Sequence, residues 1–340
     1  MDYQLPVWPY AYGGPAGTGQ IKLSADDFQV EEQLSFVPQG SGEHVFLKIE
    51  KQGENTEFVI RHLARFAGVR QRDIGYAGLK DRHARTIQWF SIWLPGQADM
   101  QWKNLETESI RVLQAVRHIR KLKHGAIKAN HFSIAIKNWQ GDISLFKQQL
   151  EQIKLNGFPN YFAEQRFGHN GQNINKALAV FQGKRVKRQQ RSIYLSAVRS
   201  WLFNQILAER IRLERWNRLM DGDFCQLNAT HSVFSLEGID ESLEQRCQQG
   251  DIHPTAMLYG TGEIAENTEA GALEQAVLAR YPELTEGLQQ AGLKAERRAM
   301  RVLPAGLQAS QLNTDEWLLN FSLPSGSYAT ALLRELINFS

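Results

Sequence analysis

A single carboxylate, Asp81, lies in a loop that is otherwise rich in positive charge. The segment from position 75 to 92 has the sequence GYAGLKDRHARTIQWFSI. Four basic or potentially basic residues flank the aspartate: Lys80, Arg82, His83 and Arg85. Because neighbouring cations favour the ionised form of a carboxyl group, we expect the pKa of Asp81 to be lowered and its side chain to be charged at neutral pH. An ionised carboxylate suits a nucleophile or an electrostatic partner better than a general acid.

Two other interpretations of Asp81 are open. Considered alone, the loop favours a turn aspartate that hydrogen-bonds its own backbone, helped by Gly78 and a local salt bridge. A metal site would require further carboxylates or histidines, and the surrounding cations would compete with a metal ion. The histidines at 118, 124 and 131 lack zinc-ligand spacing. We therefore predict no metal site.

Composition indicates an ordinary globular protein. A length of 340 residues favours two domains, and a hydrophobic content of 42% is ample for their cores. The two cysteines, Cys225 and Cys247, have neither disulfide-framework nor metal-ligand spacing, so a reducing cytoplasm fits best. The N-terminus lacks the pattern of a signal peptide, and no apolar run approaches membrane-spanning length. We expect a cytoplasmic protein that does not bind membranes.

The small net charge of +3 hides a strong segregation of charge along the chain. No acidic residue occurs from Ser109 to Gly141, where seven basic residues lie: Arg111, Arg117, Arg120, Lys121, Lys123, Lys128 and Lys137. A second run, GKRVKRQQRS at 183–192, adds five more, whereas the segment 235–290 holds eleven acids. An isolated basic run is usually solvated surface, but two long acid-free runs favour a polyanionic partner, and RNA or DNA is the leading candidate.

The apolar patterns near the start of the chain predict a mixed α+β domain. Alternating segments beginning at Phe28 and His44 are typical of half-buried strands, and a helix is expected from Asn55 or Thr56 to Gly68. The run from 86 to 94 is apolar on both faces, which predicts a strand in the middle of a sheet. A strand at 131–137 and a helix capped by Ser144 follow. The glycine-rich segment 13–22 lacks a phosphate-binding ending, so we expect a flexible turn.

The pattern becomes more helical after Gly157, with a long helix expected from Ser196 to about Trp216. Near the C-terminus, residues 316–323 alternate as a strand does, and a helix capped by Ser327 is expected next. So short a piece cannot form its own core. We therefore expect it to rejoin the N-terminal sheet, which makes the middle of the chain an insertion.

Five segments of the chain form a recognisable set: GTGQIKLSADDFQVEE, YAGLKDRHARTIQWFSI, HIRKLKHGAIKANHFSI, NYFAEQRFG and LPSGSYATALLREL. Together, and in this order, they resemble the pseudouridine synthase D family, whose members convert a uridine of transfer RNA to pseudouridine. The segment YAGLKDRHARTIQWFSI is similar to the catalytic segment of that family. The resemblance implies an α+β catalytic domain with a mixed, mainly antiparallel sheet flanked by helices, formed by residues 1–155 and 304–340. It also implies an inserted second α+β domain at 156–303.

The resemblance also implies the chemistry and the site. Asp81 is the expected catalytic nucleophile, acting on uridine 13 of tRNA without a metal or an organic cofactor, and either attack on C1′ or removal of a proton from C2′ is possible. Residues implied to bind the substrate are Phe28, Asn130, Phe132, Tyr328, Lys22 and Lys80. The resemblance also implies that Lys22 approaches Asp81 as a cationic neighbour. Residues expected to contact the RNA backbone are Arg82, Arg117, Arg120, Lys121, Lys123, Lys128, Arg166, Lys184 and Arg185.

Two alternatives to a pseudouridine synthase are kept. A non-catalytic RNA-binding or RNA-chaperone protein could keep the fold, although the intact loop around Asp81 argues against it. A metal-dependent nuclease is the weaker alternative. The expected partner is tRNA, with no obligatory protein partner and a monomeric chain.

Overall fold

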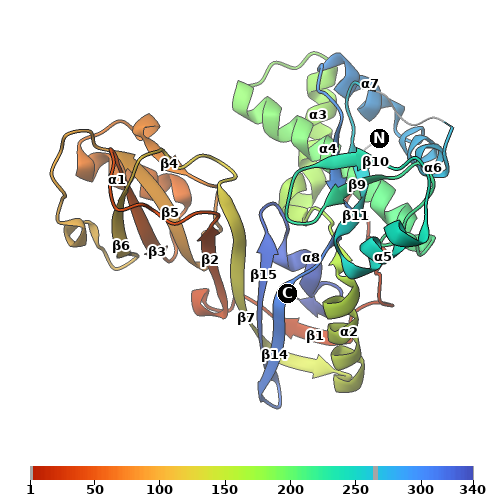
Figure 1. Cartoon of the computed structure of the whole chain (residues 1–340), viewed down its shortest axis with the longest axis horizontal. Coiled ribbons are helices and arrows are strands. Elements are labelled where there is room, and N and C mark those ends of the chain that lie inside the picture. Colours follow the sequence, from red (N-terminus) through yellow and green to blue (C-terminus); the bar gives the residue numbers. More distant parts are fainter. Residues whose placement is uncertain (1–2, 263–266, 340) are drawn as a thin grey trace. The chain divides into compact units, whose positions relative to one another are not determined.

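The apolar segments predicted near the start of the chain form strands of one large sheet, which Figure 1 shows together with the rest of the chain. The computed structural model describes residues 3–262 and 267–339. Along its main path the sheet has the order β14-β15-β7-β2-β5-β3-β6, while β1 pairs with β7 and β16, and β4 pairs with β5. Strands β2 and β5 run parallel, and the other pairs along this path run antiparallel. The predicted mixed, mainly antiparallel sheet is confirmed.

The strands of this sheet are β1 (Gly17–Gln20), β2 (Phe28–Leu34), β3 (His44–Lys51), β4 (Ile74–Tyr76), β5 (Arg85–Trp93), β6 (Ile110–His118), β7 (Ile127–Gly141), β14 (Ala305–Asn313), β15 (Glu316–Pro324) and β16 (Ile337–Phe339). The helical segments between them are η1 (Ala25–Asp27), α1 (Thr56–Ala67), η2 (Gln71–Asp73) and η3 (Trp102–Leu105).

Helix α1 begins and ends at the residues that the sequence predicts. The Asn55 side chain accepts a hydrogen bond from the Phe58 backbone at 2.7 Å, and Gly68 closes the helix in the left-handed conformation with φ of 66°. Its apolar face packs in one cluster with β3 and with Phe90 and Ile92 of β5. The opposite side of β5 contributes Trp89 to a second cluster. Strand β5 is therefore buried on both faces, as predicted.

The strand predicted near the C-terminus, β15, joins the N-terminal sheet as expected, because it pairs antiparallel with β7 and places Phe321 opposite Phe132. Other local predictions are wrong. The expected flexible turn at 13–22 contains β1, and a Cβ at Gly17 would lie 2.3 Å from the Gln140 carbonyl oxygen, so glycine allows this close approach. The helix after β15 is short and begins after Tyr328, not Ser327.

The remaining elements include a second sheet of order β10-β9-β11-β12, which the sequence patterns did not predict. Its strands are only three to seven residues long. The long helix α4 begins at Arg188 and ends at Arg212, so it starts earlier and ends sooner than expected. The helical segments are α2 (Ile143–Asn156), η4 (Glu164–Phe167), η5 (His169–Gly171), α3 (Gln172–Phe181), α4 (Arg188–Arg212), α5 (Glu241–Gln249), α6 (Glu269–Leu278), α7 (Pro282–Gln290) and α8 (Ala329–Leu333). The strands are β8 (Phe158–Pro159), β9 (Phe224–Leu227), β10 (Val233–Ser235), β11 (Ile252–Leu258), β12 (Glu296–Ala299) and β13 (Arg301–Val302).

The chain consists of two compact units. Unit 1 consists of Met1–Ala16, Ile143–Leu303 and Ser327–Ile337. Unit 2 consists of Gly17–Asp142, Pro304–Gly326 and Asn338–Ser340. These bounds differ from the predicted domain bounds, and the functional assignment of 1–155 and 304–340 to a catalytic domain stays a prediction. Among residues 3–262 and 267–339, none of the helices combines the length and apolar character needed to span a bilayer.

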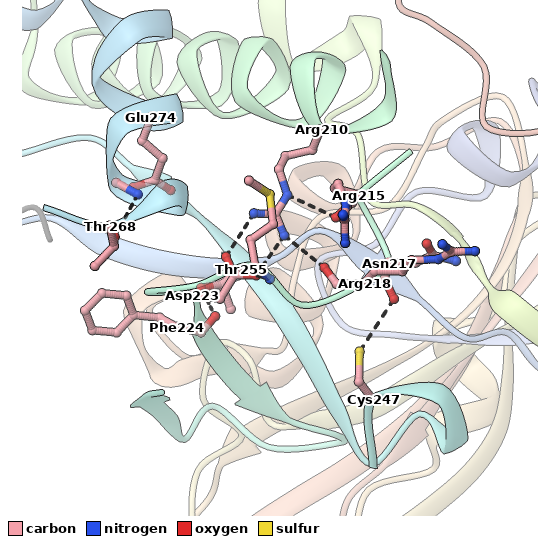
Figure 2. A network of polar contacts seen from close by, with 12 residues as sticks. Arg210, Arg215, Asn217, Arg218, Asp223, Phe224, Cys247, Thr255, Thr268 and Glu274 are labelled. Carbon is pink, nitrogen blue, oxygen red and sulfur yellow. Dashed lines mark hydrogen bonds and ion pairs between the residues drawn. The ribbon is translucent and has the colours of Figure 1, made fainter. Parts of the chain in front are cut away.

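A buried ion pair organises the loop that follows α4 in unit 1 (Figure 2). Arg210 donates two hydrogen bonds to the carboxylate of Asp223, at 3.0 and 2.8 Å, and both side chains are 2% exposed. The same guanidinium donates to the backbone carbonyls of Arg215 and Arg218, at 3.0 and 3.1 Å. The Met220 backbone N–H donates to Asp223 at 2.8 Å, so helix and loop share one satisfied network.

Substitution of Arg210 with methionine is expected to destabilise the fold strongly. It leaves the Asp223 carboxylate buried without its countercharge, which typically costs about 3–5 kcal/mol. The matched control is Arg212→Met on the same helix, since Arg212 forms an exposed pair with Glu209 at 3.0 Å, worth about 0–1 kcal/mol. Urea denaturation measures both free energies of unfolding. Equal losses in the two variants would contradict the role assigned to Arg210.

Candidate active site

Asp81 lies in the loop that connects the antiparallel strands β4 and β5 in unit 2. Its side chain is 28% exposed. One carboxylate oxygen accepts a hydrogen bond from the His83 backbone N–H at 3.0 Å, and the other accepts one from Lys22 Nζ at 2.5 Å. The first contact is the local turn interaction that the loop alone favours, and the second is an ion pair over a sequence distance of 59 residues. The turn hydrogen bond and the long-range ion pair therefore coexist at this carboxylate, and the catalytic role of Asp81 stays a prediction.

The pKa of Asp81 is lowered from its ordinary value. Partial burial raises it, but the hydrogen bond and charge of Lys22 together with the His83 backbone N–H outweigh that effect. The predicted direction agrees, but the main cation differs from those adjacent in sequence. Lys80 extends to Glu32, and Arg82 Nε donates to the Gly53 carbonyl at 2.8 Å. Asp81 is thus ionised at neutral pH and keeps some access to solvent.

Lys22 has an uncommon backbone conformation and precedes a segment with several polar contacts. Its φ of 61° lies in the left-handed region, which is uncommon for residues other than glycine and is found repeatedly at functional sites. Close by, Asp27 accepts a hydrogen bond from the Ser24 backbone at 2.6 Å and pairs with Lys137 at 2.9 Å. Lys22 Nζ also lies 4.4 Å from the centroid of the Phe28 ring. Lys22 therefore contacts both the carboxylate and an aromatic ring.

Three aromatic rings from neighbouring strands continue from this cation. The Phe28 and Phe132 ring centroids are 6.2 Å apart in an edge-to-face arrangement, and Phe132 stacks on Phe321 at 5.4 Å. Phe28 and Phe132 are only 5% and 7% exposed, as core residues are. The structure thus brings together the predicted residues Lys22, Phe28, Asp81 and Phe132. It adds Phe321, for which the only sequence signal is the alternation along β15.

Asn130 lies two residues before Phe132 on β7, so the two side chains point to the same face of the sheet. It is opposite Glu32 of β2 and Leu323 of β15. Its side-chain oxygen is buried and has no hydrogen-bond partner within the described part of the chain. Because an unpaired buried acceptor is costly, such an atom is commonly paired by a ligand or by water.

The Lys80 side chain extends toward a buried acidic residue of β2. Its Nζ lies 2.5 Å from Glu32, whose side chain is fully buried, and Glu32 also accepts a hydrogen bond from the Trp89 backbone at 2.9 Å. Burial raises the pKa of Glu32, while the Lys80 charge and both hydrogen bonds oppose that rise. Sequence reasoning did not single out Glu32. Its only signal is an acidic residue at an inward position of an alternating strand.

The residues expected to contact RNA fall into two groups. Four already donate hydrogen bonds to protein atoms: Arg82, Arg117, Lys121 and Arg166. The other five are exposed, as Arg82 and Lys121 of the first group are too: Arg120, Lys123, Lys128, Lys184 and Arg185. In unit 1, Arg166 donates to the Tyr328 hydroxyl from Nε at 3.2 Å and from Nη2 at 2.8 Å. The Tyr328 hydroxyl is therefore an acceptor for Arg166 in this structure.

A family model described as tRNA pseudouridine synthase D matches residues 5–178 and 169–336 of the chain. The chain belongs to the tRNA pseudouridine synthase D family. A relative of that description from Aeromonas salmonicida is 46% identical over 330 residues, covering 96% of this chain and 93% of the relative. Another, from Methylococcus capsulatus, is 44% identical over 333 residues, covering 97% and 94%.

The fold agrees with that of a solved family member. A crystal structure of a chain from Methanosarcina mazei, described as a tRNA pseudouridine synthase D, aligns with a TM-score of 0.74. The alignment covers 97% of this chain and 95% of that chain at 21% identity, so this likeness concerns the fold. The resemblance inferred from five short segments is therefore confirmed at the level of family and fold class.

Proposed function

We propose that the protein is a pseudouridine synthase that isomerises uridine 13 of tRNA, with Asp81 as the catalytic carboxylate. Family membership supports the reaction class, and the local observation that supports the role of Asp81 is its ion pair with Lys22 at 2.5 Å beside the Phe28 ring. The reaction breaks the bond from N1 of uracil to C1′ of ribose and joins C5 to the same carbon. One proton leaves C5 and one is gained at N1, so the nucleotide keeps its composition.

Asp81 can begin this reaction in two ways. Its ionised oxygen can attack C1′ as the base leaves, or it can remove a proton from C2′ to give a glycal. Lys22 keeps the carboxylate ionised in either case. Neither route has a redox step, so the reaction itself requires no external oxidant or reductant.

The base must leave its stack to reach a carboxylate in a protein loop. We propose that Phe28 and Phe132 supply apolar surface for the displaced uracil. The unpaired Asn130 oxygen is suited to accept a hydrogen bond from a base N–H, which would satisfy its buried acceptor. Tyr328, with its hydroxyl held by Arg166, is proposed as a further residue that contacts the substrate.

A direct assay tests this function. Purified protein is incubated with an unmodified tRNA transcript that carries uridine 13, and pseudouridine is mapped along the product. We expect one modified position, formed equally well in the presence of a metal chelator. RNA cleavage that stops when divalent ions are removed would instead indicate a nuclease. Tight RNA binding without any pseudouridine would favour a non-catalytic RNA-binding or RNA-chaperone protein.

Phosphate contacts predict a strong dependence of RNA binding on salt. The variants Lys123→Glu and Lys128→Glu change exposed residues of the acid-free segment. Each is expected to weaken tRNA binding without changing the modified position, and to reduce the slope of log affinity against log salt by about one per lost contact. Lys103→Glu, an exposed change outside the basic segments, is the control. Fluorescence anisotropy at several salt concentrations gives the slopes, and identical slopes in all variants would exclude these contacts.

We propose that the protein works in the cytoplasm as a monomer. Both cysteines, Cys225 and Cys247, are buried and unpaired, which suits a reducing compartment.

A further inference from the structure

Three consecutive residues of the loop that carries Asp81 each form a hydrogen bond with one short segment, residues 51–56. The Lys80 backbone N–H donates to Thr56 Oγ1 at 3.0 Å. The Asp81 backbone carbonyl accepts from Lys51 Nζ at 3.1 Å. Arg82 Nε donates to the Gly53 carbonyl at 2.8 Å. The loop is therefore attached to this segment at Asp81 and at both of its neighbours in sequence.

The start of the loop is fixed by the same network. Gln88 of β5 donates to the Gly78 carbonyl at 2.6 Å and accepts a hydrogen bond from Thr56 at 3.1 Å. The Thr56 hydroxyl is therefore hydrogen-bonded both to the Lys80 backbone and to Gln88, and Gln88 in turn is hydrogen-bonded to Gly78 at the start of the loop. These contacts leave the Asp81 main chain little freedom relative to the strands below it.

Lys51 is the central member of this network. It ends β3, where it is opposite Thr86 of β5 and Ile110 of β6, and it is 1% exposed. Its Nζ donates at 2.7 Å to the Glu54 carbonyl as well as to Asp81, so one buried ammonium group bridges the turn after β3 and the catalytic loop. A long charged side chain is rarely buried so completely unless its charge is paired or hydrogen-bonded.

We infer that Lys51 is a positioning residue for the proposed reaction: it holds the Asp81 main chain from inside the sheet, so that the carboxylate stays aligned with Lys22 and with the ribose of the substrate. This inference rests on the proposed function. Lys51 does not contact the Asp81 carboxylate through a hydrogen bond, and its action passes through the Asp81 carbonyl. Displacing a reacting group by about 1 Å can lower a rate by about 100-fold.

The charges around Lys51 make the contact sensitive to pH. Burial is the main cause that lowers the pKa of Lys51, to about 8, and the positive charge of Lys80 lowers it further. The negative charges of Asp81, Glu54 and Glu32 raise the pKa and so oppose this change. Below pH 8 the ammonium form makes the stronger, charge-assisted bonds, and above pH 8 the neutral amine predominates. The alignment of Asp81 should therefore weaken as the pH rises through about 8.

Single-turnover rates on tRNA between pH 6 and 10 test this inference. The wild-type rate should decline with a midpoint near pH 8. Lys51→Met should lower the rate at pH 7 by about 100-fold, remove the pH-dependent decline, and leave tRNA affinity unchanged within about twofold. Lys51→Arg, which keeps its charge at high pH, should retain more activity than Lys51→Met and show no decline near pH 8. The matched control is Lys48→Met. Lys48 lies on the same strand as Lys51, but its ammonium group pairs with Glu31, at 2.5 Å, and not with the loop that carries Asp81.

Hydrogen–deuterium exchange separates a failure of this inference from a failure of the proposed function. The amides of residues 78–84 should lose protection in Lys51→Met and keep it in Lys48→Met, whether or not pseudouridine is formed. Unchanged protection in Lys51→Met would overturn the inference even if the wild-type protein proved inactive. A decline near pH 8 that persists in Lys51→Arg would overturn it in an active protein.

Discussion

Asp81→Asn is expected to abolish pseudouridine formation while tRNA affinity stays within about threefold of the wild type. Asparagine has the same shape and can still accept the His83 backbone hydrogen bond, so the turn should persist. It is neutral, however, and can neither attack C1′ nor remove a proton from C2′. The loss of a catalytic base or nucleophile lowers rates by about 10⁴-fold or more. Single-turnover assays with excess enzyme and a parallel binding titration measure the two quantities.

The matched control for Asp81→Asn is Asp73→Asn. Asp73 is the nearest acid upstream of the loop, and it pairs with Arg70 at 3.5 Å, with Arg70 largely exposed. The change should leave turnover and affinity near wild-type values, since a pair at the surface with one largely exposed partner contributes about 0–1 kcal/mol. Equal turnover by Asp81→Asn and the wild type would refute the assignment of Asp81.

The sequence identifies Asp81 but not the geometry around it. A carboxylate among cations predicts a lowered pKa, and the structure agrees in direction. The positions of the charged residues in the loop favour Lys80 and Arg82 as the cations that lower the pKa of Asp81. The structure instead pairs Asp81 with Lys22, which only the family resemblance indicated. Adjacent side chains leave the backbone in different directions, so neighbours in sequence need not share a face. A partner 59 residues away depends on tertiary packing that local patterns do not contain.

The fold was predictable where burial imposes a clear pattern. Strand β5 is apolar on both faces and lies within the sheet, and β15 alternates and rejoins β7. The sheet β10-β9-β11-β12 was missed because its short strands have little periodicity, and its pairing joins residues such as Cys225 and Pro254 that lie far apart in sequence. Lys51 and Glu32 were missed for a related reason, since a charged residue in a strand is expected to be solvated unless its buried partners are known.

Lys22→Met should shift the acid limb of the pH–rate profile to higher pH. In the wild type, burial raises the pKa of Asp81, and the Lys22 hydrogen bond and charge are the main effects that lower it. Without them the His83 backbone hydrogen bond remains, so the carboxyl group should titrate at a higher pH than in the wild type, because an adjacent opposite charge no longer favours its ionised form. Because the ionised form is the reactive one, activity is then lost earlier as the pH falls. At pH 7 the rate should also fall by about 100-fold if Lys22 fixes the carboxylate orientation.

Rates measured from pH 5 to 8 with a folded tRNA substrate distinguish a charge effect from a packing effect at Lys22. Lys22→Arg keeps the positive charge and should restore most of the acid limb, even though its larger head group cannot reproduce the 2.5 Å contact. If the limb has the same midpoint in wild type, Lys22→Met and Lys22→Arg, the group that titrates is not Asp81 under the control of Lys22. If only the arginine variant resembles the wild type, the positive charge beside Asp81 determines the pH at which the carboxylate becomes reactive.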